Sequence, residues 1–182
     1  MKFQIVLLCL FFLVELNATP FYFKSYDMED GLSNNHVTCC VQDDYGFMWF
    51  GTRDGLNRFD SKKFYTFKSY SSEKGSLMSS YILDLAKSPT GQIWVSTNLG
   101  LQKYDYQTDS FTLIDFTKGI NCYSLQFDQQ GNLWMILNGY SLVKYNESQG
   151  MHLNYMYKGS DPITSFYITP VSYTHLTLPT KA

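Results

Sequence analysis

Short runs of alternating apolar and polar residues recur along this chain, and each run is bounded by turn-forming residues. Three of the runs share one frame, in which a glycine stands three residues before a tryptophan. The tryptophans follow one another after 45 and then 40 residues. A repeat of this length made only of strand-like pieces is typical of one β-propeller blade. The repeat signature consists of Gly46 and Trp49, Gly91 and Trp94, and Gly131 and Trp134.

Each repeat contains four strand-like runs that are rich in aromatic and β-branched residues, which suit a half-buried pleated surface. In the first repeat these are residues 37–41, the run at Trp49, 55–60 and 64–67. The turn before each tryptophan begins with Asp or Ser and ends with Gly, as at Asp43 and Gly46. Asp binds its own downstream backbone and Gly accepts positive φ, so both favour a hairpin.

The repeats therefore predict an all-β fold, a partial β-propeller of about three four-stranded blades. We expect each tryptophan to fill the wedge between neighbouring blades. The propeller repeats are assigned to residues 19–168. The predicted units are blade 1 at about 32–70, blade 2 at about 77–116, blade 3 at about 119–157, and the start of blade 4 at about 163–168.

The two ends of the chain differ from the repeats. Residues 1–18 combine an early Lys, a short apolar core and a small residue, which is typical of a signal peptide. The motif Phe-Lys-Ser-Tyr at 23–26 recurs at 67–70, so residues 21–26 are expected to form an outer strand that completes the last blade of a closed ring. Residues 169–182 lack the Gly and Trp of a fourth repeat, and we interpret them as a non-native tail.

Charge and cysteine content limit the kinds of ligand and metal that we expect this chain to bind. The formal net charge is −2 with no basic stripe, so we expect no direct nucleic acid contact by this segment. Cys39, Cys40 and Cys122 show no metal-ligand spacing, and we interpret them as small buried hydrophobic residues. Hairpin turns account for Asp43, Asp44 and Asp128 better than calcium binding does. We therefore predict no cofactor and no metal site.

Candidate ligand contacts cluster at one predicted end of the blades. Arg53, Asn98 and Asn138 each follow their tryptophan by four residues, so they should ring the same end of the central channel. The loop entering the first inner strand adds Asn34 and Asn35 at that end. Arg and Asn side chains suit sugar hydroxyl groups. The alternative is that these residues serve only as turn formers, since Asn tolerates left-handed backbone conformations.

The first repeat resembles the regulator-propeller repeat of two-component systems. The resemblance rests on Gly31-Leu32-Ser33-Asn34-Asn35, on residues 42–52, and on Asp54-Gly55-Leu56-Asn57-Arg58-Phe59-Asp60, and it extends more loosely over residues 21–168. The second repeat departs at Ser88, Pro89 and Ser96, and the third at 137–140. These departures affect the assignment of individual residues more than that of the fold.

The resemblance implies a seven-bladed propeller in the periplasmic sensor region of a Bacteroidetes hybrid two-component regulator. Such regulators are anchored in the inner membrane and carry a histidine kinase and a DNA-binding domain in other parts of the chain. This segment, as an N-terminal fragment, would be a non-catalytic sensor of oligosaccharides that controls signal transduction and transcription. The implied partners are an oligosaccharide ligand, the rest of the parent sensor chain and a second copy in a full-length homodimer.

Two alternatives remain open on the residues. A sialidase-like glycosidase propeller carries an Asp-x-Gly-x-x-Trp turn, which residues 44–49 match and the second and third repeats do not. Glycosidases also need two carboxyl groups that flank one bond, and these strands offer no evident pair. A protein-interaction scaffold is the second alternative, since propellers commonly serve that role.

Overall fold

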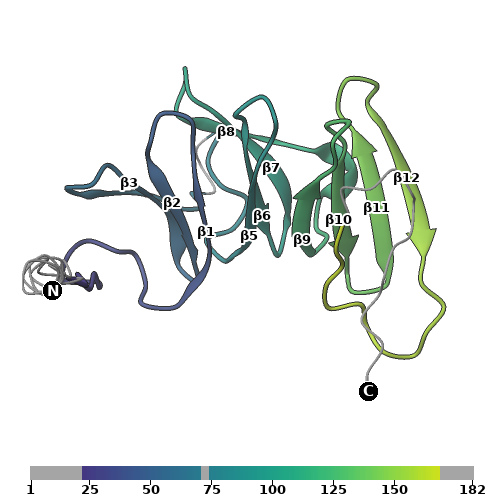
Figure 1. Ribbon diagram of the computed structural model, residues 1–182, viewed down its shortest axis with the longest axis horizontal. Helices are drawn as coiled ribbons and strands as arrows, with labels where there is room; N and C mark the ends of the chain where they lie inside the picture. Colours follow the sequence, from purple (N-terminus) through teal and green to yellow (C-terminus); the bar gives the residue numbers. More distant parts are fainter. Residues whose placement is uncertain (1–21, 71–73, 169–182) are drawn as a thin grey trace, which may run out of the picture.

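The computed structural model describes residues 22–70 and 74–168 of the 182-residue chain. Three four-stranded antiparallel sheets follow one another along the sequence, and they stand side by side like the blades of a fan (Figure 1). Blade 1 comprises β1 (Val37–Gln42), β2 (Met48–Thr52), β3 (Gly55–Phe59) and β4 (Phe64–Phe67). Blade 2 comprises β5 (Ile82–Lys87), β6 (Ile93–Thr97), β7 (Gly100–Asp105) and β8 (Ser110–Leu113). Blade 3 comprises β9 (Cys122–Phe127), β10 (Leu133–Leu137), β11 (Ser141–Asn146) and β12 (Met151–Met156).

Within every sheet the strand order follows the chain order, as a meander of hairpins requires. A 3-10 turn, η1 (Asp115–Thr117), is the further regular element in the described residues. The all-β, propeller-type fold predicted from the repeats is therefore confirmed. The predicted signal peptide at 1–18 and the predicted tail at 169–182 lie outside the described residues.

The hairpin between the first and second strand of each blade is closed by local chemistry. In blade 1 the Asp43 carboxylate accepts the backbone N–H groups of Tyr45 and Phe47, at 3.0 and 2.9 Å. Gly46 follows with φ of +88°, in the left-handed region that a side chain would strain. In blade 2 the Ser88 hydroxyl takes the same part and accepts the backbone N–H of Gln92 at 3.0 Å.

The tryptophans fill the wedges between blades, as predicted. Trp49 and Trp94 have no exposed surface, and each packs against the next blade. Burying apolar side chains of this kind contributes about 1.5–3 kcal/mol each, so the wedges dominate the packing between blades. The core cluster that contains Trp49 includes, from blade 2, Ile82, Leu85, Ile93, Val95, Tyr104 and Phe111.

Hydrogen bonds between side chain and backbone join neighbouring inner strands. The Thr38 hydroxyl of β1 donates to the Ile82 carbonyl of β5 at 2.9 Å. The Asp84 carboxylate of β5 accepts the Leu125 backbone N–H of β9 at 2.7 Å. Because these bonds reach from one sheet to the next, they fix the relative register of the blades.

Residues 163–168 take up the position of a fourth inner strand without forming a strand. Ile163 and Phe166 are buried against Trp134, as Ile82 and Leu85 are against Trp49. The Ile163 N–H donates to the Gly139 carbonyl at 2.7 Å. No second strand pairs with this segment among the described residues, so the regular ladder is missing.

The strand expected at 21–26 is not formed in the described part of that segment, residues 22–26. Its Tyr26 ring instead lies edge-on to Phe59 and Phe64, at 4.9 and 5.8 Å between centroids. A strand needs a neighbouring strand to pair with, and the three sheets described here provide none at this position.

Candidate functional site

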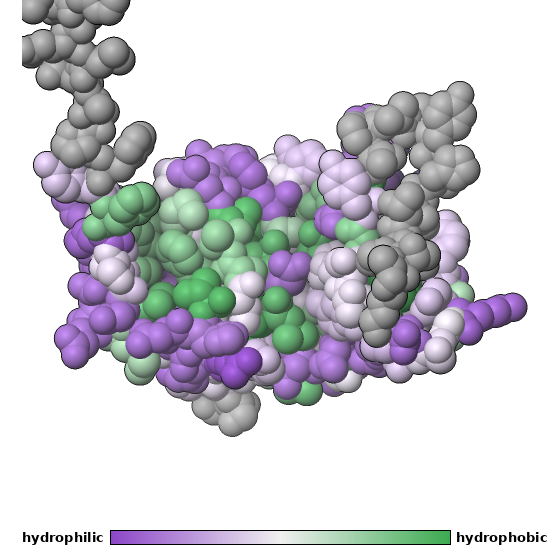
Figure 2. Space-filling model, turned by 60° about the horizontal axis from the view of Figure 1, so that its bottom comes forward, coloured by the Kyte–Doolittle hydropathy of each residue, from purple (hydrophilic) through white to green (hydrophobic). Residues whose placement is uncertain are grey.

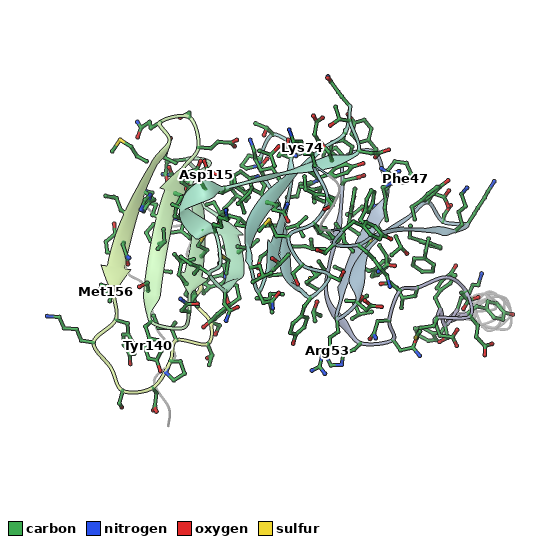
Figure 3. The ribbon with its side chains drawn as sticks, turned by 180° about the vertical axis from the view of Figure 1, so that it is seen from behind. Phe47, Arg53, Lys74, Asp115, Tyr140 and Met156 are labelled. Carbon is green, nitrogen blue, oxygen red and sulfur yellow. The ribbon has the colours of Figure 1, made fainter. Side chains whose placement is uncertain are left out.

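Arg53, Asn98 and Asn138 lie in the turns between the second and third strands of their blades. Figure 3 shows Arg53 and Tyr140 at one end of the molecule and Phe47, from the opposite turns, at the other. The Arg53 N–H donates to the His36 carbonyl at 3.3 Å, and the Asn138 N–H donates to the Asn121 carbonyl at 3.0 Å. Each turn is thus tied to a loop that enters an inner strand.

We call Arg53, Asn98, Asn138, Asn34 and Asn35 the polar rim. In three of the four asparagines, the side-chain oxygen accepts a hydrogen bond from a backbone N–H group. Asn34 Oδ1 accepts the His36 N–H at 2.8 Å, and Asn138 Oδ1 accepts the Asn121 N–H at 3.1 Å. Asn35 Oδ1 accepts the Met28 N–H at 3.0 Å and holds the N-terminal segment against the blade. A ligand would therefore meet the NH₂ groups of these side chains, which are donors.

Asn98 differs from the other asparagines of the rim. Its side-chain oxygen is inaccessible to solvent and has no hydrogen-bond partner among the described residues. An unpartnered buried acceptor costs about 1–3 kcal/mol. Arg53, in contrast, is exposed and offers the five N–H donors of its guanidinium.

Exposed aromatic rings accompany the rim. Tyr81 stands in the loop before β5 and Tyr140 in the β10–β11 turn, and their exposed fractions are 37% and 45%. Figure 2 turns this end of the molecule toward the viewer and shows a hydrophobic band between hydrophilic margins. Donor groups beside exposed aromatic rings are an arrangement that suits sugar rings, whose faces are apolar and whose edges carry hydroxyl groups.

The turn carboxylates at the opposite end have internal partners. Asp43 Oδ2 accepts the indole N–H of Trp49 at 2.8 Å, and Asp128 Oδ2 accepts that of Trp134 at 2.9 Å. The sequence indicated the turn role of these acids but not their bond to the tryptophan. The bond could have been predicted from the sequence, because an Asp stands six residues before each of these two tryptophans.

Asp84 is a buried acid that the sequence reasoning did not single out. Burial raises its pKa, although the backbone N–H groups of Leu125, Leu85 and Ser124 act against that shift. The sequence does contain an indication of this buried acid, because Asp84 is the single charged residue within the apolar run 82–86. Its Oδ1 accepts the Leu85 N–H of its own strand and its Oδ2 accepts the Leu125 N–H of β9, so its role is to join blades 2 and 3.

The three cysteines differ in exposure: Cys122 is buried and Cys39 is partly buried, whereas Cys40 is exposed, so the expectation of burial was wrong for Cys40. Burial raises the pKa of the Cys39 and Cys122 thiols to about 12, which keeps both groups protonated at neutral pH. Within residues 22–70 and 74–168, no three His, Cys, Asp or Glu side chains come together as a metal site would require. No helix in this described part has the length and hydropathy needed to cross a membrane.

Comparison with known proteins places this architecture. The family model described as two component regulator propeller matches residues 31–54. Histidine kinase P4 of Formosa agariphila is 46% identical over 67 residues, which cover 36% of this chain and 5% of that protein. This chain therefore spans a small part of the length of that relative.

Two solved structures from B. thetaiotaomicron share the fold. The extracellular domain described for the hybrid two-component system BT3049 is 28% identical, with a TM-score of 0.67, over 75% of this chain and 20% of that one. The extracellular domain described for the system BT4673 is 24% identical, with a TM-score of 0.62, over 73% of this chain and 18% of that one. The first repeat therefore matches the two component regulator propeller family, and the blades are similar to those in the extracellular domain of BT3049.

Proposed function

We propose that this propeller segment is part of the extracytoplasmic ligand-sensing region of a hybrid two-component regulator. The likeness to the extracellular domain of BT3049, at 28% identity and a TM-score of 0.67, carries this proposal. In the parent protein the segment would lie in the periplasm, and the inner membrane would separate it from the kinase. A homodimer of the full-length chain would then bring two sensor regions together.

The ligand class that we propose is an oligosaccharide. The polar rim supplies N–H donors from Arg53 and the asparagine amides, and sugar hydroxyl oxygens accept such bonds. The exposed rings of Tyr81 and Tyr140 supply apolar surface at the same end. Together these groups match the two kinds of surface that a pyranose ring presents.

Sensing by such a segment needs binding without chemistry. A ligand that binds two conformations of the sensor region with different affinity shifts their populations, and a distant kinase reads that shift. The size of the response is limited by the ratio of the two affinities. The propeller would therefore act as a non-catalytic element whose rim distinguishes the two states.

A glycan array probed with the intact chain tests this proposal, followed by calorimetry on any glycan that binds. We expect binding that weakens in Arg53→Ala and Asn98→Ala. Lys62→Ala, in the turn after β3, is the matched control and should bind as the unaltered chain does. Absence of binding to every glycan would contradict the proposal, and release of cleaved sugar would favour the glycosidase alternative.

A further inference from the structure

The end of the blades opposite the polar rim contains an open groove of about 480 Å³. It lies among the turns that join the first and second strands of the three blades. Asp44 comes from blade 1, Lys87 to Pro89 from blade 2, and Phe127 and Asp128 from blade 3. We call this hollow the turn groove. Its volume falls within the range of small-ligand sites, about 300–1,000 Å³.

One part of the turn groove is a bridge between blades. Lys87 Nζ donates to Asp44 Oδ1 at 2.5 Å, while the side chains remain 34% and 59% exposed. The other oxygen of Asp44 lies close to Gly91, since a Cβ added to that glycine would be 2.2 Å away. The pair thus presents a hydrogen-bond donor beside an acceptor at the junction of two blades.

Another part of the turn groove is apolar. The half-buried Phe127 ring meets the buried Trp94 ring edge-on, with 6.0 Å between centroids and 66° between planes. That contact supports the Phe127 ring from below. Pro89 is exposed and adds a second apolar surface. A rigid aromatic ring at the rim of an open groove is a suitable platform for the apolar face of a sugar.

Asp128, the other acid of the groove, already uses both carboxylate oxygens in internal hydrogen bonds. Both oxygens of Asp128 accept hydrogen bonds from Asn132 side-chain or backbone N–H groups, and Oδ2 also binds the Trp134 indole. Among the lining residues, the Asp44–Lys87 pair and Phe127 offer a hydrogen-bonding pair beside an aromatic surface.

We propose that the turn groove is a second sugar-binding subsite, which holds a neutral pyranoside unit. A neutral ion pair suits vicinal hydroxyl groups, because one hydroxyl can donate to Asp44 while its neighbour accepts from Lys87. The ring face of the same unit then stacks on Phe127. This inference rests on the proposed function, since it names where on the propeller an oligosaccharide makes a further contact.

The sequence contains a signal for this groove. Lys87 and Phe127 occupy the same repeat position, directly before the turn residue Ser88 or Asp128. Aligning the repeats therefore places both side chains at the same end of neighbouring blades. Their meeting with Asp44 depends on how closely the blades pack, which the alignment alone does not give.

The test is an NMR titration of the full chain with three neutral trisaccharides: maltotriose, mannotriose and galactotriose. We expect backbone amide signals at residues 87–89 and 127–129 to shift and saturate with at least one of them. Signals that move only at Arg53 and Asn98 would overturn the groove while leaving the proposed function intact. A titration with no shift at any position would count against both.

Two variants sharpen the test. Lys87→Met keeps the aliphatic stem and removes the donor, and we expect about tenfold weaker binding at the groove. Phe127→Ala removes the platform, and we expect a larger loss, with the melting temperature measured to check the packing on Trp94. Lys62→Met, the same change at an exposed lysine that does not line the groove, is the matched control and should leave the groove affinity unchanged. Equal binding by Lys87→Met and the unaltered chain would overturn the role of the ion pair.

Discussion

Blades 1 and 3 hold their wedge tryptophan with a carboxylate, whereas blade 2 does not. The Asp43 and Asp128 carboxylates accept the indole N–H groups of Trp49 and Trp134 at 2.8 and 2.9 Å. Ser88 stands at the corresponding position of blade 2, and the buried indole nitrogen of Trp94 has no partner among the described residues. The three sheets are nevertheless built from the same four strands in the same order.

This difference separates the contribution of tryptophan packing to blade stability from that of the hydrogen bond to the indole N–H. An unsatisfied buried N–H costs about 1–3 kcal/mol, and blade 2 bears that cost. Trp94 is still fully buried, and it packs with Leu125, Leu133 and Met135 of blade 3. Packing of the tryptophan in the wedge therefore decides the arrangement of the blades, and the bond to the indole adds stability to an arrangement that is already formed.

The largest effect that we expect is from Trp94→Ala. Removing this fully buried side chain should lower the free energy of unfolding by about 3–5 kcal/mol, because it leaves a large cavity between blades 2 and 3. Urea unfolding followed by circular dichroism measures the change. An unaltered unfolding midpoint would show that the wedge is not the main source of contact between blades.

The second prediction compares Trp49→Phe with Trp94→Phe. Both variants lose part of the ring, but only Trp49→Phe removes the indole donor from the buried Asp43 carboxylate. We expect Trp49→Phe to be the more destabilising by about 1–3 kcal/mol. The two unfolding curves measure that difference, and equal losses would mean that the carboxylate contributes little.

The third prediction gives blade 2 the carboxylate that blades 1 and 3 have. Ser88→Asp supplies the missing acceptor for the Trp94 indole, and Lys103, whose ammonium lies 5.7 Å from the Trp94 ring centroid, is a cation near the new carboxylate. We expect a gain of about 1 kcal/mol in unfolding free energy. Ser88→Ala is the control, and it should destabilise because the Gln92 N–H loses its partner. A lower melting temperature for Ser88→Asp would refute this account of blade 2.

The smallest effect is a pH dependence confined to acid. Burial opposes ionisation of Asp128, yet bonds from Trp134 and Asn132, with the Lys144 ammonium nearby, hold its pKa below the ordinary value. A lowered pKa stabilises the folded state above the unfolded value, near pH 4, and that contribution is lost as pH falls through the folded pKa.

We therefore expect the stability difference between the unaltered chain and Asp128→Asn to shrink below about pH 4. Thermal unfolding from pH 6 to pH 2.5 measures it. Ser88→Asn in blade 2 is the control, because no carboxylate stands at that position, and its difference from the unaltered chain should not change with acid. A difference for Asp128→Asn that stays constant over this range would contradict the assignment.

Prediction from the sequence was most successful where the relevant chemistry is local. The turn at Asp43 and Gly46 involves residues within five positions, and hydrogen bonds and φ values there agree with the expectation. Prediction was less successful at residues 22–26 and 163–168, which were expected to be strands. Their alternation fits a strand, but a strand also needs a pairing partner, and the described sheets provide none.

For the polar rim, too, the positions of the residues were predictable from the sequence and their individual hydrogen bonds were not. A constant offset of four residues from each tryptophan was enough to place Arg53, Asn98 and Asn138 in equivalent turns at one end. The bonds made by Asn34, Asn35 and Asn138 were not predictable individually, because they depend on the paths of the loops that enter the inner strands. Whether these residues contact a ligand is a prediction that the glycan experiments address.

The sequence by itself determined the repeat, its strands and turns, and the place of each tryptophan, because these follow from periodicity and from turn chemistry within a few residues. Only the tertiary structure decided which polar groups meet between blades. The Asp84 bond to Leu125 and the Asp44 pair with Lys87 join residues 41 and 43 positions apart. Such contacts depend on the distance between packed sheets, which the wedge side chains set collectively and which no single segment encodes.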